Sequence, residues 1–106
     1  MAAEAKRTVT VQEALNHGFA LQTSGRREEA EAVYRKILET SPDHPDALHL
    51  LGIVRRQSGH PEEAIELIGK AIAVNPKNAS YVSNLGTAYE AAHKNDDDPT
   101  AIRSQW

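Results

Sequence analysis

SGRREEAE at residues 24–31 and SGHPEEAI at residues 58–65 are near copies that lie 34 residues apart in this 106-residue sequence. Gly18, Gly52 and Gly86 keep the same spacing. So many matches at a single offset indicate an internal repeat and not a chance likeness. The first unit covers residues 11–44, the second covers residues 45–78, and a third begins at residue 79 and stops matching near residue 93.

Each unit is expected to form two helices joined by a turn. Apolar residues recur at helical spacing on both sides of Gly25, and a glycine tolerates the left-handed backbone that ends a helix. Thr10 and Glu13 have the spacing of a capping box at the start of the first helix. Pro42 marks the end of the second helix, because proline cannot continue one. The second unit copies this plan, and the third predicts a fifth helix from residue 79 to about residue 93.

Small residues recur where the two helices of a unit would cross. The pattern places Gly18 against Ala30 and Gly52 against Ala64, one residue from each helix. Two helices approach closely only where their side chains are small, so we expect a tight crossing in each pair.

The unit resembles a tetratricopeptide repeat, a helix–turn–helix of this length. The first unit matches that pattern at Gly18, Leu21, Gly25, Ala30, Tyr34, Ile37 and Pro42, and the second matches it at Leu48, Leu51, Gly52, Gly59, Ala64, Ile68, Ala71 and Pro76. The third matches at Leu85, Gly86, Ala88 and Tyr89. The resemblance implies an all-α fold, an α-solenoid of antiparallel helix pairs with about two and a half repeats. A further short helix could begin at Pro99.

The domain organisation follows from the extent of the repeats. Residues 11–93 are expected to form one repeat domain, because the chain is too short for a second domain of ordinary size. Residues 1–10 are expected to be a flexible N-terminal segment, and residues 94–106 an acidic C-terminal tail that includes Asp96, Asp97 and Asp98.

The resemblance implies a binding groove, because in this family the first helix of each pair lines the concave face of the superhelix. The groove residues would be Gln12, Leu15, Asn16, Phe19, His49, Leu50, Ile53, Arg56, Asn84 and Thr87. Such a mixture suits an extended peptide, since apolar pockets take side chains and amides bind the peptide backbone.

Two groove asparagines have a counterpart in one branch of the family. Asn16 and Asn84 match the asparagine ladder of the repeats of O-linked N-acetylglucosamine transferases, whereas Leu50 interrupts it. An asparagine amide carries both a donor and an acceptor, so it can bind a peptide backbone. The alternative is that Asn16 and Asn84 are only solvated polar residues on an exposed face.

The composition excludes several classes of function. The chain has no cysteine, so it forms no disulfide and no thiolate metal site. Twelve basic residues against fifteen acidic ones give a net charge of −3, which disfavours a nucleic-acid partner. No apolar run approaches the length of a membrane span, and no secretory signal is visible. We therefore expect a cytoplasmic protein without a membrane or nucleic-acid partner.

The titratable residues do not predict a catalytic or metal site. No two of the five histidines have the spacing that places two ligands on one face of a helix. His17 is expected to be a hydrogen-bonded core residue. The pairs Glu28–Glu29 and Glu62–Glu63 fall in the first turn of a helix, where negative charge favours the helix dipole. We therefore expect no enzyme activity, no metal and no cofactor.

The main hypothesis is a non-catalytic protein-interaction module or scaffold that binds an extended peptide or a segment of a partner protein. One alternative is self-association into a homodimer through the incomplete third repeat, where Val82, Leu85 and Tyr89 form one apolar stripe on the expected fifth helix. Another is that the chain is the N-terminal repeat region of a larger glycosyltransferase- or sulfotransferase-like enzyme.

Overall fold

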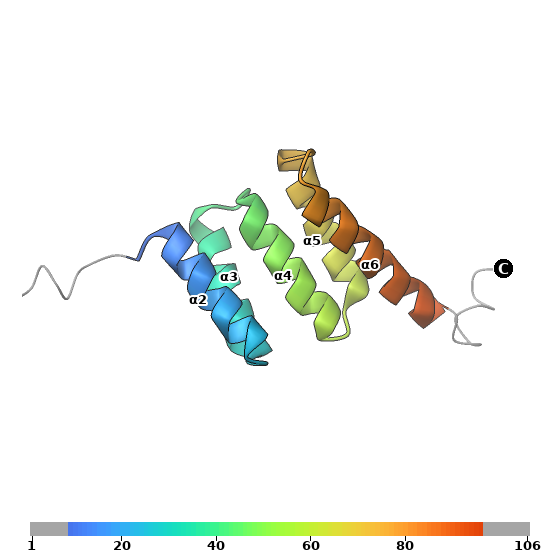
Figure 1. The fold of residues 1–106 in the computed structure, drawn as a ribbon, viewed down its shortest axis with the longest axis horizontal. Helices are drawn as coiled ribbons and strands as arrows, with labels where there is room; N and C mark the ends of the chain where they lie inside the picture. The colour runs from blue at the N-terminus through green and yellow to red at the C-terminus, as the bar shows by residue number, and fades with distance from the viewer. Residues whose placement is uncertain (1–8, 97–106) are drawn as a thin grey trace, which may run out of the picture.

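The computed structural model describes residues 9–96, which form helices α2 (Val11–Thr23), α3 (Arg27–Thr40), α4 (Pro45–Gln57), α5 (Pro61–Val74) and α6 (Ala79–Asp96). Figure 1 shows α2, α4 and α6 side by side in one layer, with α3 and α5 behind them in a second layer. This arrangement confirms the all-α solenoid of antiparallel helix pairs. The expected N-terminal segment and C-terminal tail fall largely outside the described residues, so the proposed division into segments stays a prediction.

Local backbone chemistry sets the ends of the helices as the sequence predicts. The Thr10 hydroxyl accepts a hydrogen bond from the Glu13 amide at 3.0 Å, and the Glu13 carboxylate accepts one from the Thr10 amide at 2.9 Å. Gly25 and Gly59 have φ angles of +84° and +91°, the left-handed region that glycine adopts without strain. These two turns reverse the chain and make the helices of each pair antiparallel.

The core consists of two connected groups of apolar side chains. The first joins both repeats around Tyr34, Leu51 and Val54, and the second lies around Ile68 and Tyr81. Leu38 and Leu67 pack against both groups. The apolar core is therefore continuous along the array, and each repeat is held by its neighbour.

The glycines at the helix crossings have no room for a side chain. A Cβ atom on Gly18 would lie 2.6 Å from Cε1 of Tyr34, and one on Gly52 would lie 2.6 Å from Cγ1 of Ile68. The tight crossings are therefore present, but the nearest neighbours are larger than expected. At Gly18 the contact comes from the Tyr34 ring and not from Ala30, because Tyr34 lies one turn further along α3 and its ring is long enough to reach the glycine.

Arg55 is the centre of an ion-pair ring that the sequence pattern does not predict. Its guanidinium donates to the carboxylates of Glu31 at 2.9 Å and Glu63 at 2.8 Å. Arg35 donates to the same two carboxylates at 2.8 and 3.3 Å. The four residues form a closed ring that ties α3, α4 and α5 together, so in the second repeat a charged residue stands where the first has the apolar Leu21.

We predict that Gly52→Ala lowers the free energy of unfolding by about 1–3 kcal/mol, because the new methyl group would overlap Ile68. The matched control is Gly69→Ala in α5, where a Cβ meets nothing within 4 Å. Alanine is the better helix former, so this control should be stabilised by up to about 1 kcal/mol. Urea unfolding followed by circular dichroism measures both. A Gly52→Ala protein as stable as wild type would contradict the tight crossing.

We also predict that Arg55→Met lowers the free energy of unfolding by about 1 kcal/mol near neutral pH. Burial raises the pKa of the Glu31 and Glu63 carboxyls, but the hydrogen bonds and charges of Arg35 and Arg55 outweigh it and lower both pKa values below 4.5. A lowered carboxyl pKa contributes stability that is complete above pH 4.5 and is lost as the pH falls through the folded-state pKa. The difference between variant and wild type should therefore shrink in acid.

The control for this prediction is Arg26→Met, which removes an exposed pair with Glu29 within a single helical turn. An exposed pair of this kind contributes little, so its loss should change stability by less than about 0.5 kcal/mol. Thermal melts of the three proteins at several pH values measure the effect. Equal losses for Arg55→Met and Arg26→Met would show that the ring has no special role.

Candidate binding surfaces

The first helices of the repeats form one continuous face. In the described chain α2 contacts α4, and α4 contacts α6. Figure 1 shows these three helices running alongside one another in the front layer. All of the groove residues expected from the sequence lie on them, four each on α2 and α4 and two on α6.

Most of these groove residues offer some surface to a partner. Gln12 and Asn16 are exposed, and Phe19 leaves 51% of its surface in water. Half-buried residues complete the set: Leu50, Ile53, Arg56, Asn84 and Thr87. The face therefore combines an exposed aromatic ring with amides, a hydroxyl and one cation.

Leu15 and His49 differ from the expectation, because both are buried. Leu15 is 4% exposed and packs in the first apolar group with Tyr34 and Leu51. His49 is 8% exposed and lies between α4 and α6. Both occupy the side of the first helix that meets the next repeat, so they hold the repeats together and offer little surface to a ligand.

The amides of this face already make bonds within the chain. Asn16 accepts a hydrogen bond from Gln12 at 3.0 Å through its side-chain oxygen, which leaves its NH₂ group available. Nδ2 of Asn84 lies 2.8 Å from Nε2 of His49. An amide nitrogen only donates, so the His49 ring accepts in its neutral form and the Asn84 oxygen stays available.

A polar cluster between α4 and α6 was missed by the sequence reasoning. The Tyr81 hydroxyl donates to the Asp46 carboxylate, and the rings of Tyr81 and His49 lie with their centroids 4.5 Å apart. Burial, together with the Asp46 carboxylate, raises the pKa of Tyr81 far above its ordinary value. Burial lowers the pKa of His49, although the Asp46 charge acts in the opposite direction.

One signal in the sequence could have revealed this cluster. The residues one repeat before His49 and Asn84 are Leu15 and Leu50, which belong to the same apolar group. Both positions change from apolar to polar together in the next repeat. Such a joint change indicates that the two positions face each other across the repeat boundary.

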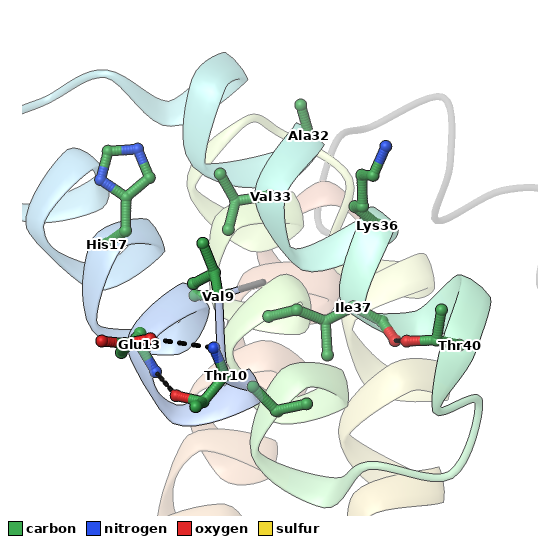
Figure 2. Close-up of a pocket in the computed structure, with 11 residues that line it drawn as sticks. Val9, Thr10, Glu13, His17, Ala32, Val33, Lys36, Ile37 and Thr40 are labelled. Carbon is green, nitrogen blue, oxygen red and sulfur yellow. Dashed lines mark hydrogen bonds between the residues drawn. The ribbon is translucent and has the colours of Figure 1, made fainter. Parts of the chain in front are cut away.

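A separate pocket of about 720 Å³ opens between α2 and α3, at the end of the array away from α6. Figure 2 shows Val9, Val33 and Ile37 among the residues that line it, with His17 and Lys36 nearby. Val9 is exposed to solvent. His17 is exposed as well, so the expectation that it is a core residue is wrong. The side of α2 that carries His17 is not packed against another helix of the described chain.

The stripe expected on the fifth helix is only partly exposed. Val82 and Tyr89 leave 52% and 56% of their surfaces in water, whereas Leu85 is half-buried against the second apolar group. A Cβ atom on Gly86 would meet nothing within 4 Å. The short helix that could begin at Pro99 lies outside the described residues.

Neither a metal-binding cluster nor a membrane-spanning helix is found among the described residues. Residues 9–96 contain no group of three or more histidine, aspartate or glutamate side chains that could hold a metal ion. Within the same range, no helix is long and apolar enough to cross a membrane.

Comparison with known proteins identifies relatives of the repeats. The model of the tetratricopeptide repeat family matches residues 21–89. Cellulose synthase operon protein C of Komagataeibacter xylinus is 39% identical over 60% of this chain and 5% of its own length. A photosystem I assembly protein of Prochlorococcus marinus is 33% identical over 69% of this chain and 44% of its own length. The chain thus spans less than half the length of these curated relatives.

A solved structure of an O-GlcNAc transferase from Thermobaculum terrenum is also similar. It superposes with a TM-score of 0.72 and 32% sequence identity, and the match covers 77% of this chain and 16% of the transferase. The likeness agrees with the branch of the family that the sequence pattern resembles.

We predict that the stability of the protein falls as the pH is lowered through the range in which His49 protonates. The pKa of His49 is below its ordinary 6.5 in the folded protein, so the unfolded chain binds the proton first as the pH falls. Stability should therefore drop between about pH 7.5 and about pH 5.5. Urea midpoints at the two pH values measure the drop.

The informative variant is His49→Gln, which can accept the hydrogen bond from Asn84 but cannot titrate. It should lose less stability than wild type over the same pH range. The control is His60→Gln, since His60 is exposed and makes no capping hydrogen bond with its side chain. A His49→Gln protein with the full wild-type pH dependence would show that another group is responsible.

Proposed function

Because the chain belongs to the tetratricopeptide repeat family, whose repeats are non-catalytic modules that generally mediate protein–protein interaction, we propose that the face formed by α2, α4 and α6 binds an extended peptide segment of a partner protein. The observation that carries the proposal is Phe19, a large apolar side chain that leaves 51% of its surface in water. Its exposure has a cost in the free chain that a bound apolar side chain would remove.

The apolar part of the proposed site spans two helices. Phe19 lies on α2, and Leu50 and Ile53 lie half-buried on α4, so the contact would cross the boundary between the repeats. A peptide that lies across the helices would place one apolar side chain against this group. Burial of a side chain of leucine or phenylalanine size contributes roughly 1.5–3 kcal/mol.

The polar part of the site supplies backbone recognition. The free NH₂ group of Asn16 can donate to a peptide carbonyl, and the free oxygen of Asn84 can accept from a peptide amide. Leu50 stands between them in the series, so the two amides would hold the peptide on either side of the apolar contact.

Arg56 gives the site a preference for acidic peptides. Its guanidinium makes no ion pair within the described chain, and its Nε atom is buried without a hydrogen-bond partner. A carboxylate from the ligand would offset the charge of the guanidinium. We therefore propose that the bound segment carries an apolar residue followed or preceded by an acidic one.

A second candidate function is recognition of protein substrates on behalf of a glycosyltransferase-like enzyme. The similarity to the O-GlcNAc transferase structure favours it, because the sequence identity is 32% and the match covers most of this chain. Under this hypothesis the chain should bind the acceptor peptides of such an enzyme. If the chain binds other peptides but not these acceptor peptides, the second candidate function is wrong and the general role in protein interaction is unaffected.

We predict that Phe19→Ser combined with Ile53→Ser weakens peptide binding at least about tenfold, equivalent to about 1.4 kcal/mol. Screening an array of random 12-residue peptides against the wild-type chain would supply the probe, and titration calorimetry would measure the loss. The helical circular dichroism spectrum should be unchanged, because Phe19 is largely exposed.

The matched control is Val74→Ser, which removes an exposed apolar side chain at the end of α5, away from the proposed site. Its binding should equal that of wild type. Equal affinity of the Phe19→Ser and Ile53→Ser double variant and wild type would refute the proposed site, and joint loss of helix and binding would place the two residues in the core.

A further inference from the structure

The third repeat lacks a contact that the first two repeats make. Gly18, Gly52 and Gly86 occupy the same place in their repeats, and at Gly18 and Gly52 a side chain of the following helix fills the adjacent space. At Gly86 no described residue fills that space, and Val82 and Tyr89 on either side of it are exposed. Within residues 9–96, helix α6 therefore carries an unfilled helix-contact surface, which we call the α6 stripe: Val82, Gly86 and Tyr89.

The opposite end of the array carries an apolar recess. The pocket between α2 and α3 has apolar walls that include Val9, Val11, Ala14 and Val33. One repeat later, the positions that correspond to the pocket residues Glu13 and His17 hold Ala47 and Leu51, which are buried against the first repeat. The pocket is thus on the side of a repeat that the neighbouring repeat covers elsewhere in the same chain.

These two surfaces cannot meet within one molecule. Helices α2 and α6 make no contact with each other, and α4 lies between them (Figure 1). We propose that the α6 stripe of one copy packs into the α2–α3 pocket of a second copy, so that the chain associates head to tail. The open backbone at Gly86 lets α6 approach the pocket closely, and Val82 and Tyr89 enter it as a ridge enters a groove.

The charges at the two surfaces are complementary. Lys36 lines the pocket, is exposed, and makes no ion pair within the described chain. Glu90 follows Tyr89, is exposed, and is likewise without an ion pair in residues 9–96. Head-to-tail packing brings the surface that carries the Lys36 cation against the surface that carries the Glu90 carboxylate. A dimer formed by two α6 stripes would leave the α2–α3 pockets of both copies empty.

Head-to-tail association would also change the length of the face formed by α2, α4 and α6. Because the contact joins two different surfaces, a dimer still has one free surface of each kind. Unless the rotation between copies closes a ring, further copies can add and the assembly grows with concentration. Each added copy would set its own α2, α4 and α6 beyond those of its neighbour. Association would therefore lengthen the face on which the proposed peptide site lies.

The test blocks each end separately. Val9→Glu with Ala32→Glu places charges on exposed residues of the pocket, and Val82→Glu with Tyr89→Glu places charges on the stripe. Val74→Glu is the matched control outside both surfaces. The readout is sedimentation velocity of the full chain over about a hundredfold range of concentration, with circular dichroism to confirm that each variant is helical.

Head-to-tail packing predicts that the mass of wild type and of Val74→Glu rises with concentration and that each end-blocked variant stays monomeric. An equimolar mixture of the two end-blocked variants should form a one-to-one dimer, because each variant keeps the surface that the other has lost. A wild-type chain that is monomeric throughout overturns the proposal, whether or not residues 97–106 cover the stripe. Dimers of the pocket-blocked variant alone overturn it as well, since they would show stripe-to-stripe contact.

A charge exchange provides a second test that leaves the apolar residues unchanged. Lys36→Glu and Glu90→Lys should each weaken association, and the chain that carries both should associate more strongly than either single variant. Additive weakening in the double variant would overturn the proposed pairing of the two surfaces. Neither test changes Phe19 or Ile53, so failure of head-to-tail association and failure of the peptide site are distinguishable.

Discussion

The close contact between a glycine on the first helix and a large side chain on the second determines the geometry of this protein. Ile68 lies against Gly52 and Tyr34 lies against Gly18, at distances that exclude even a methyl group. Because each crossing is so close, any side chain larger than hydrogen at the glycine would force the helices of the pair apart. The common face of α2, α4 and α6 depends on this contact in the first two repeats.

The next level of organisation is the joint between repeats, where the chain uses two different chemistries. The first repeat meets the second through apolar side chains, with Leu15 and Leu50 in one group. The second meets the third through an apolar group around Ile68, to which His49 and Asn84 add a hydrogen bond across the boundary. The ring around Arg55 adds an ionic tie between α3, α4 and α5. The two joints therefore differ in side-chain chemistry, although their backbones follow the same plan.

The features that could be predicted from the sequence are those set by the local backbone. The capping box at Thr10 and the turn at Gly25 depend on residues within a few positions of each other, and the 34-residue offset repeats such local signals at a fixed spacing. The ring of Arg55 and the bond from Asn84 to His49 join residues up to 35 positions apart. They depend on side-chain rotamers at the repeat boundary, which a periodic pattern does not specify. The prediction that His17 is a core residue is wrong for a related reason. Periodicity shows on which side of the helix a residue lies, but not whether another helix covers that side.

The same regularity that sets α2, α4 and α6 in one face also leaves two unlike ends among the described helices. Within an array, each repeat needs a covering neighbour on both sides, and the described helices supply one only at the inner boundaries. At α2 and α3 the uncovered side is recessed, whereas at α6 it is a ridge with an open glycine at its centre. A recess and a ridge are complementary in shape, and the proposed head-to-tail contact uses this complementarity. The complementary ends thus support the proposed association between different surfaces, which would add copies along the solenoid and lengthen the face formed by α2, α4 and α6.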